Sequence, residues 1–364
     1  MRITIFLLLL ISHSLITAKN LNSSNFATLA VAPEASLSKK IRTDKVRIGF
    51  GSCAVQTAEQ SIWQTIAANN PNLFILLGDN AYIDSADPAD MQKAYQTWYA
   101  NPNFKSFKDS TSLLATWDDH DYGLNDGGKE FVGKAHAKEA FIDFFSYDEL
   151  EQLRHKPQGI YHARIMQQGN LTIQIIMLDT RWYRDDLTPS DLSLEQRKKK
   201  LLGPYQSTKD SKKQLLGKEQ WRWLNKQLEV NADVRIIASS IQVVADFTGW
   251  ESWLNFPEQR EQLLNWLSAS NTAYPIIISG DVHRGEISSM TFNGRNIIEL
   301  TASGLDAKLY PAAPNKHRLQ PAVIEPHFGW LEITKTANTI DISGSIRNIN
   351  NQSKNQVTVS IEDE

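Results

Sequence analysis

Several short apolar segments of the chain are followed closely by side chains that could bind metal ions. These side chains are mainly carboxylates, with one thiol, one phenol and one imidazole: Cys53, Asp79, Tyr82, Asp119, Asp281 and His283. Carboxylate-rich sets suit Ca²⁺, Mg²⁺, Mn²⁺ or iron, and a tyrosinate is a hard donor suited to Fe³⁺. Structural zinc sites prefer closed sets of Cys and His, so this mixture does not indicate one.

Carboxylates gathered in this way would repel one another unless cations neutralised them. Two or more metal ions are therefore the simplest interpretation. Sites with two metals characteristically carry out in-line displacement at phosphorus. The residue pattern is thus typical of a centre for that chemistry.

The segments that must position these side chains are expected to be buried strands joined by helices. Apolar runs predict strands over 46–50, 74–77, 113–117, 171–178, 235–239 and 275–279. Helical spacing predicts helices over 57–69, 88–108, 133–146, 218–228 and 257–268. Polar residues at the carboxyl ends of such strands commonly meet at one edge of a sheet. Taken alone, Asp79 after Gly78 is equally consistent with an Asx-type turn.

The amino-acid composition limits the kinds of protein that this chain can be. The 364 residues are 41% hydrophobic and 22% charged, as in globular proteins, with a formal net charge of −3. No basic field exists to hold the phosphates of nucleic acid, so a general nucleic-acid binder is not expected. Cys53 is the single cysteine, so no intramolecular disulfide can form, and stability must come from a large core or bound metal.

The N-terminus predicts export. Residues 1–18 combine a basic start, a short apolar run and small residues, which indicates a secretory signal peptide and a periplasmic or extracellular location. An uncleaved anchor is the alternative, although the apolar run is too short for a stable membrane span. Residues 19–45 are predicted to form a mobile leader, and 46–364 a single domain, expected to be monomeric.

Five motifs resemble those of the PhoD-like alkaline phosphatases and phosphodiesterases of the metallophosphatase superfamily. They are Phe50-Gly51-Ser52-Cys53, Leu77-Gly78-Asp79-Asn80-Ala81-Tyr82, Thr116-Trp117-Asp118-Asp119-His120-Asp121-Tyr122-Gly123, Leu178-Asp179-Thr180-Arg181-Trp182-Tyr183-Arg184 and Ser279-Gly280-Asp281-Val282-His283. The resemblance implies an α/β (α+β) fold, a metallophosphatase-like β-sandwich of two mixed sheets flanked by helices.

The resemblance also implies roles for individual residues. The implied ligands of an Fe³⁺ ion are Cys53, Asp79, Tyr82 and His283, those of a Ca²⁺ ion are Asp79, Asp119 and Asp281, and Mn²⁺, Mg²⁺ or Zn²⁺ are the alternatives. His120 occupies the position of the acid that protonates the leaving group, with Asp121 expected to orient it. The implied phosphate contacts are Arg181 and Arg184, and Asp118 and Asn125 are lesser candidates for the Ca²⁺ ion or for the substrate.

These features together predict a secreted phosphodiesterase or phosphomonoesterase in which a metal-bridged hydroxide attacks phosphorus. One alternative is a phospholipase-type or wall-polymer phosphodiesterase, in which loops 185–213 and 246–256 cover a lipid-facing mouth. Another is a non-catalytic, metal-stabilised extracellular binding protein. Structural interpretations also stay open: Cys53, Tyr82 and His283 as packed core residues, and Arg184 as a surface ion-pair partner.

Overall fold

The structure is a computed structural model that describes residues 44–269 and 273–362. The predicted signal peptide (1–18) lies outside the described residues, as does the predicted leader (19–45) except for its last two residues. Asp44 and Lys45 belong to the first strand, which therefore begins two residues before the predicted domain start at 46.

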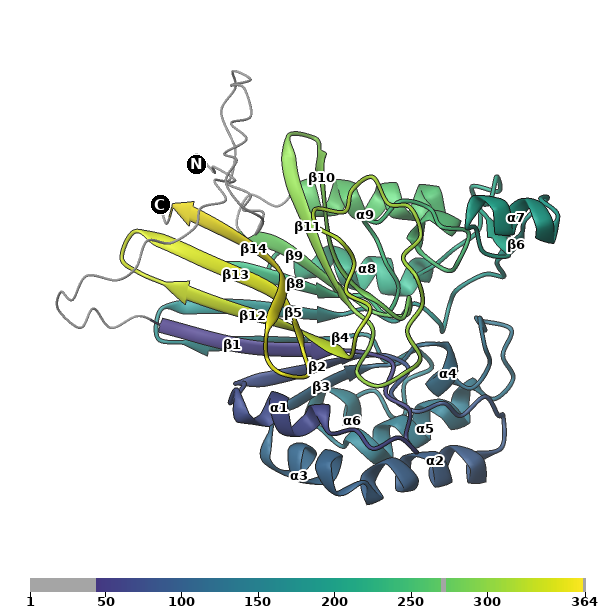
Figure 1. Cartoon of the computed structure of the whole chain (residues 1–364), viewed down its shortest axis with the longest axis horizontal. Helices are drawn as coiled ribbons and strands as arrows, with labels where there is room; N and C mark the ends of the chain where they lie inside the picture. The colour runs from purple at the N-terminus through teal and green to yellow at the C-terminus, as the bar shows by residue number, and fades with distance from the viewer. Residues whose placement is uncertain (1–43, 270–272, 363–364) are drawn as a thin grey trace.

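Two six-stranded sheets, flanked by helices, form the centre of the molecule (Figure 1). The strands are β1 (Asp44–Gly51), β2 (Leu73–Leu77), β3 (Leu113–Thr116), β4 (His162–Gln168), β5 (Leu171–Met177), β6 (Thr188–Pro189), β7 (Tyr205–Gln206), β8 (Val234–Ala238), β9 (Tyr274–Ser279), β10 (Gly285–Phe292), β11 (Arg295–Ala302), β12 (His327–Lys335), β13 (Thr339–Asn348) and β14 (Ser353–Glu362). The helices are α1 (Ile62–Ala68), α2 (Pro88–Ala100), α3 (Pro102–Ser110), α4 (Asp119–Tyr122), α5 (Lys134–Phe145), α6 (Asp148–Glu151), α7 (Leu194–Lys200), α8 (Gly217–Gln227) and α9 (Pro257–Ala269), with a 3₁₀ turn, η1 (Trp253–Asn255).

Both sheets mix parallel and antiparallel pairing, which confirms the predicted sandwich of two mixed sheets flanked by helices. The first sheet has the order β14-β13-β12-β1-β2-β3, and the second β10-β11-β9-β8-β5-β4. Strands β1, β2 and β3 run parallel, as do β5, β8, β9 and β11. Strand β1 pairs antiparallel with β12, from Asp44 opposite Lys335 to Phe50 opposite Gly329.

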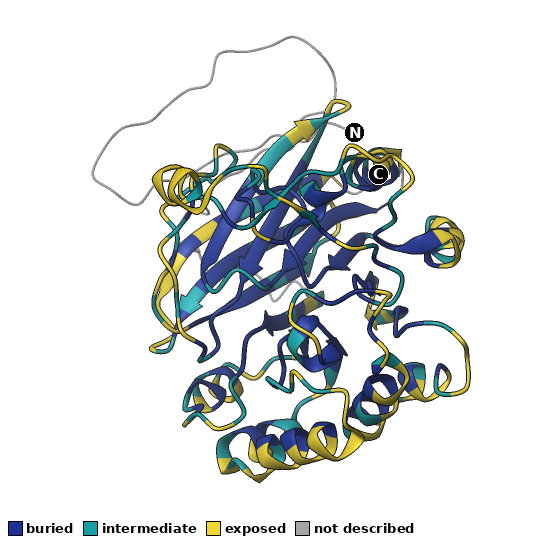
Figure 2. Ribbon diagram, turned by 90° about the vertical axis from the view of Figure 1, so that its right-hand side faces the viewer, coloured by how far each residue is buried: buried dark blue, intermediate teal, exposed yellow. Residues whose placement is uncertain are grey.

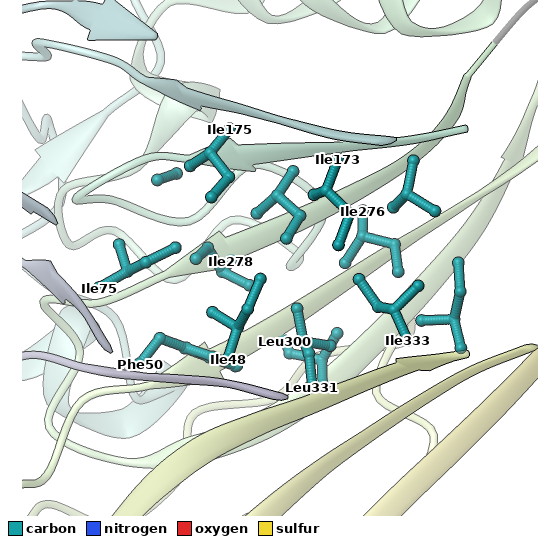
Figure 3. Packing of buried hydrophobic residues seen from close by; sticks show 14 of the residues in the cluster. Ile48, Phe50, Ile75, Ile173, Ile175, Ile276, Ile278, Leu300, Leu331 and Ile333 are labelled. Carbon is teal, nitrogen blue, oxygen red and sulfur yellow. The ribbon is translucent and has the colours of Figure 1, made fainter. Parts of the chain in front are cut away.

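The main core lies between the two sheets. Isoleucines and leucines from both sheets interdigitate there (Figure 3), among them Ile48, Ile75, Ile175, Ile276 and Leu331. Because helices cover the other face of the parallel strands, these strands are apolar on both faces. In β2, for example, Leu73, Ile75 and Leu77 join the inter-sheet core, while Phe74 and Leu76 pack toward the helices.

Helices shield the outer faces of the parallel strands. Helices α1, α2, α3 and α5 supply an aromatic cluster against β2 and β3, in which Trp63 packs against Phe74 and Phe107. Helices α8 and α9 pack Trp221 and Leu263 against the second sheet. Figure 2 shows the result: the flanking helices are exposed on their outward faces, and the strands behind them are buried.

The segment 185–213, named above as one of two loops over a lipid-facing mouth, contains some regular secondary structure. It contains helix α7 and the two-residue strands β6 and β7, which pair antiparallel. None of the helices in the described ranges has the length and apolar character needed to cross a bilayer.

The carboxyl ends of parallel strands from both sheets converge on one edge of the sandwich. Ser52, after β1, donates its N–H to Ala302 O at the end of β11, and Gly280, after β9, donates to Ser240 O after β8. The Ser240 hydroxyl in turn donates to Asp118, after β3, at 2.6 Å. The expected common edge for the chemistry-bearing residues is therefore present.

Gly329→Ala is expected to lower the free energy of unfolding by about 2 kcal/mol, because a Cβ at this position overlaps the ring of Phe50, its antiparallel partner. Denaturant unfolding followed by tryptophan fluorescence measures the change.

The double variant Gly329→Ala/Phe50→Leu is the matched test, because leucine lacks the ring atoms that overlap the new methyl group. The two substitutions should be less destabilising together than the sum of their separate effects. Additive costs, or a single Gly329→Ala variant as stable as the parent, would contradict the packing of β1 on β12.

Candidate active site

Four potential ligands meet where β1, β2 and β9 end. The Cys53 Sγ lies 3.5 Å from Asp79 Oδ2, and the Tyr82 hydroxyl lies 3.0 Å from His283 Nε2. One ligand atom from each of Cys53, Asp79 and His283 falls within 4.8 Å of the others. The structure thus brings together the thiol, phenol, imidazole and first carboxylate predicted from the sequence.

Several candidate ligands have backbone conformations with positive φ, which set the direction of their side chains. Residues in the left-handed region include Cys53 (φ 64°), Asp79 (φ 49°), Asp281 (φ 69°) and His283 (φ 51°). A non-glycine residue there costs on the order of 1 kcal/mol, and such strain persists where the surrounding structure enforces it. Gly78 (φ 104°) allows the end of β2 to approach β3, since a Cβ there would lie 2.7 Å from Asp118 N.

Hydrogen bonds fix the orientation and protonation of the imidazole of His283. Its Nδ1 lies 2.6 Å from Lys308 O, so Nδ1 carries the proton and Nε2 presents a lone pair toward Tyr82. Burial lowers the pKa of His283, which favours this neutral form. A neutral histidine held through its second nitrogen is the usual form of a metal ligand.

Ser303 links two of the candidate ligands. Its hydroxyl lies 3.1 Å from Cys53 Sγ and accepts the backbone N–H of His283 at 2.8 Å. The backbone of Ser303 is fixed in turn by a hydrogen bond, because its N–H donates to His327 Nε2 at 3.2 Å. Burial raises the pKa of the Cys53 thiol, and its hydrogen bonds with Ser303 and Ser52 oppose that shift.

A second group of carboxylates shares Asp79 with the first. Ligand oxygens of Asp79, Asp118 and Asp281 lie within 4.8 Å of one another. Asp118 Oδ2 is buried and has no hydrogen-bond partner among the described residues. The structure therefore places Asp118, rather than the predicted Asp119, in the group that contains Asp281.

Asp119 lies beside this group, with both carboxylate oxygens accepting backbone N–H groups. Its Oδ1 accepts from His120 N at 3.0 Å and its Oδ2 from Asp126 N at 2.7 Å. It also belongs to two other acidic groups, one with Asp79 and His120 and one with Asp126 and Glu251. Its role as a metal ligand stays a prediction.

The crowded carboxylates disturb one another's ionisation. Burial and the negative charges of Cys53 and Asp119 raise the pKa of Asp79 well above its ordinary value. Burial and the charges of Asp118 and Asp119 do the same to Asp281, and burial raises the pKa of Asp118 to about 6. Bound cations would remove this repulsion, so the buried oxygen of Asp118 and the mixed donors of the first group fit metal ions.

His120 stands next to both groups and is oriented by Asp84. Its Nδ1 lies 2.8 Å and 2.9 Å from the two oxygens of Asp84, and its ring lies 4.2 Å from that of Tyr82. Burial lowers the pKa of His120, but the hydrogen bond with Asp84 and the charge of Asp119 outweigh it and raise the pKa to about 9. Its Nε2 makes no hydrogen bond within the described part of the chain.

The expectation that Asp121 orients His120 is wrong. Asp121 is fully buried and accepts the N–H groups of Asp118 and Asn80, together with the side-chain amide of Asn80. It thus holds the ends of β2 and β3 together at the start of α4, and its carboxylate is engaged there although it directly follows His120 in the chain.

The predicted phosphate contacts of Arg181 and Arg184 are also corrected. Both side chains are fully buried. Arg181 donates to Asp118, to Glu251 Oε2 at 2.7 Å and to Gly127 O, while Arg184 pairs with Glu251 Oε1 at 3.0 Å and with backbone carbonyls. Because these guanidinium groups are inaccessible and already paired, they do not face a substrate. Arg181 neutralises Asp118 directly, and Arg184 is connected to Arg181 through the shared carboxylate of Glu251.

Two other polar residues border the site. Asn125 is exposed and donates to Asp126 Oδ2 at 3.0 Å, so the structure places it on the rim, and its contact with substrate stays a prediction. Arg284 follows His283 directly and is buried, yet its Nη2 has no hydrogen-bond partner among the described residues.

Sequence reasoning missed the residues that support the candidate ligands, namely Asp84, Ser303, Lys308 and Glu251. Asp84 had a usable signal, since it lies two residues after Tyr82 in the loop that follows β2. The other three reach the site from distant loops, and no spacing in the sequence marks them.

Comparisons with known proteins agree with this geometry. The family profile described as PhoD-like phosphatase matches residues 48–351. Alkaline phosphatase D of Bacillus subtilis (strain 168) is 27% identical over 219 residues, which are 55% of this chain and 36% of the relative. The chain thus spans about a third of the length of this curated relative.

Solved structures share the fold. The structure described as PhoD superposes with a TM-score of 0.67 at 19% identity, covering 93% of this chain and 73% of the other. A dimetal phosphatase from Danio rerio gives 0.51 at 13% identity, covering 86% and 98%. Since the family profile spans residues 48–351, which is most of the chain and includes all the candidate ligands, the chain belongs to the PhoD-like phosphatase family.

Proposed function

We propose that this protein is an exported, metal-dependent phosphoric ester hydrolase. The observation that carries the proposal is the convergence of Cys53, Asp79, Tyr82 and His283 beside a second carboxylate group, with His120 adjacent. Membership of the PhoD-like phosphatase family supports the same activity. Residues 1–18 are proposed as the export signal, and 46–364 as one domain acting as a monomer.

The residues fit two cations of different character. Cys53, Asp79, Tyr82 and His283 would hold the first, and a thiolate with a phenolate suits Fe³⁺. Asp79, Asp118 and Asp281, with Asp119 close by, would hold the second, and an all-oxygen set suits Ca²⁺. When bound, such cations stabilise charge on phosphoryl oxygens and acidify water at the site.

His120 is proposed as the general acid. The Asp84 carboxylate accepts a hydrogen bond from Nδ1–H of His120, so Nε2 is the nitrogen that can deliver a proton to a departing alcohol oxygen. Because its pKa is raised to about 9, the imidazole of His120 is protonated near neutral pH, as a general acid requires. Asp84 acts through His120 as a positioning residue.

Arg284 replaces Arg181 as the proposed phosphate contact. Arg284 is also buried, with its Nε 3.7 Å from Glu286 Oε1 and its Nη1 donating to Val282 O at 3.3 Å, but its Nη2 has no hydrogen-bond partner among the described residues. An unpaired buried guanidinium nitrogen is costly, and a phosphate oxygen would satisfy it.

The first test is hydrolysis of bis(p-nitrophenyl) phosphate and of an alkyl phosphate ester by protein loaded with iron and calcium. His120→Ala is expected to lower turnover of the alkyl ester about 100-fold or more, since an alkoxide needs protonation on leaving. The loss should be smaller for p-nitrophenolate, a good leaving group, and elemental analysis should find the metal content unchanged.

Two controls define this test. His136→Ala removes an exposed histidine on α5 and should leave turnover unaltered. Cys53→Ala should reduce the bound iron. Absence of turnover with every metal tried would favour the non-catalytic binding protein, and loss of metal from His120→Ala would make His120 a ligand instead of the acid.

Asp84→Asn is expected to lower turnover about tenfold with metal content intact, because the substitution removes the carboxylate that orients the His120 ring. Asparagine tolerates the left-handed backbone at this position (φ 47°), so the loop should keep its shape. Glu139→Gln, an exposed change on α5, is the matched control. Full activity in Asp84→Asn would remove Asp84 from the mechanism.

Ser303→Ala is expected to weaken iron binding about tenfold and to shift the visible thiolate-to-iron absorption of the loaded protein, because it removes the hydroxyl held at 3.1 Å from Cys53 Sγ. Ser303→Thr keeps the hydroxyl and should restore both properties. An unchanged spectrum in the alanine variant would show that Ser303 serves packing alone.

A further inference from the structure

Two leucines at the ends of helix α7 are largely exposed in the part of the chain that the structure describes. Leu194, at its first position, is 57% exposed, and Leu201, just after its last, is 61% exposed. None of the residues of α7 is buried. Figure 1 shows this helix at the margin of the molecule, beyond the ends of the sheets.

The same helix is strongly basic. Arg197, Lys198, Lys199 and Lys200 form its last turn, against one acidic residue, Glu195. These cations also interact favourably with the carboxyl end of the helix. The three lysines are exposed.

Trp250 extends this surface from a neighbouring loop. It is 52% exposed, and Gly203 lies so close beneath it that a Cβ there would approach its ring at 2.7 Å. We call residues 194–201 together with Trp250 the basic apolar tip.

The basic apolar tip is joined firmly to the candidate active site. Gly203 N donates to Thr248 O and Tyr205 N to Gly249 O, both at 2.9 Å, so the chain after α7 is paired with the loop that holds Trp250. The residue after Trp250 is Glu251, whose carboxylate binds Arg181, and Arg181 binds Asp118. The tip is therefore connected to the carboxylate groups through paired backbone and the Glu251–Arg181–Asp118 ion pairs.

We infer that the basic apolar tip docks on a membrane surface rich in anionic phospholipid. Exposed leucine and tryptophan combined with clustered lysine and arginine is the composition of helices that lie in the headgroup region of a bilayer. The charge is local, since the whole chain has a formal net charge of −3. Attraction to a dissolved polyanion would account for the lysines but leaves the exposed leucines without a role.

Docking of this kind would present the active site to phosphate esters at a membrane surface. The two loops predicted to form a lipid-facing mouth, 185–213 and 246–256, are the ones that build the tip. The inference concerns where the protein is held and does not depend on the chemistry proposed above.

Cosedimentation of the full chain with lipid vesicles tests the inference. One set of vesicles contains phosphatidylcholine alone, and the other equal parts of phosphatidylcholine and phosphatidylglycerol. We expect binding to the anionic vesicles only. The variant K198Q/K199Q/K200Q should bind about 100-fold more weakly, because each lysine contributes at the anionic surface.

A second variant separates apolar insertion from charge attraction. L194Q/L201N keeps every charge, and asparagine suits the left-handed backbone at Leu201 (φ 56°). It should bind about tenfold more weakly. Two matched controls, K93Q/K156Q/K354Q and Ile165→Thr, remove exposed lysines and an exposed isoleucine elsewhere and should bind as the parent does.

Three outcomes would overturn the inference. They are no binding to anionic vesicles, equal loss of binding in the lysine control, and undiminished binding by L194Q/L201N, which would indicate a purely electrostatic contact with a polyanion. All variants should hydrolyse soluble bis(p-nitrophenyl) phosphate like the parent, so failed docking is distinguishable from failure of the proposed function.

Discussion

Repulsion among buried carboxylates is the constraint on which this structure depends. Asp79, Asp118 and Asp281 place oxygens within 4.8 Å of one another, with Asp79 and Asp118 buried and Asp281 half-buried. Burial of unpaired negative charge is among the costliest features a protein can contain. Positive charge nearby stabilises these carboxylates. Arg181 supplies it by donating to Asp118, and bound cations would supply it at the Asp118 oxygen that has no hydrogen-bond partner among the described residues.

The rest of the fold provides the rigidity that this cluster requires. Cys53, Asp79, Asp281 and His283 sit in left-handed backbone conformations in the segments that follow the buried strands β1, β2 and β9. The inter-sheet core holds those strands in place, and the hydrogen bonds of Ser303, Lys308 and Asp84 lock the side chains. The sandwich thus tolerates local strain at one edge because its centre is tightly packed on both faces of the parallel strands.

The parts predictable from sequence are those governed by local pattern. Continuous apolar runs such as 74–77 predicted strands that are covered on both faces. The polar residues that follow these runs predicted that the strand ends meet at one edge of the sandwich. Side-chain partners were not predictable in this way. Arg181 follows an apolar strand just as Cys53 does, yet it turns into the interior because Asp118 and Glu251 reach it from other elements. Asp84, and not Asp121, faces His120 because the loop after β2 folds back over α4, where Ile83 and Asp84 donate to His120 O.

The pairing of β1 with β12 affects how the chain can acquire its structure. Asp44 lies opposite Lys335, so the strand that precedes Cys53 lacks one neighbour until almost the whole polypeptide is available. Contacts between such distant segments form slowly, because loop closure precedes any gain from packing. During vectorial synthesis, the strand that leads to Cys53 would therefore gain its second neighbour only when the last strands are added, so the candidate metal site would be completed late.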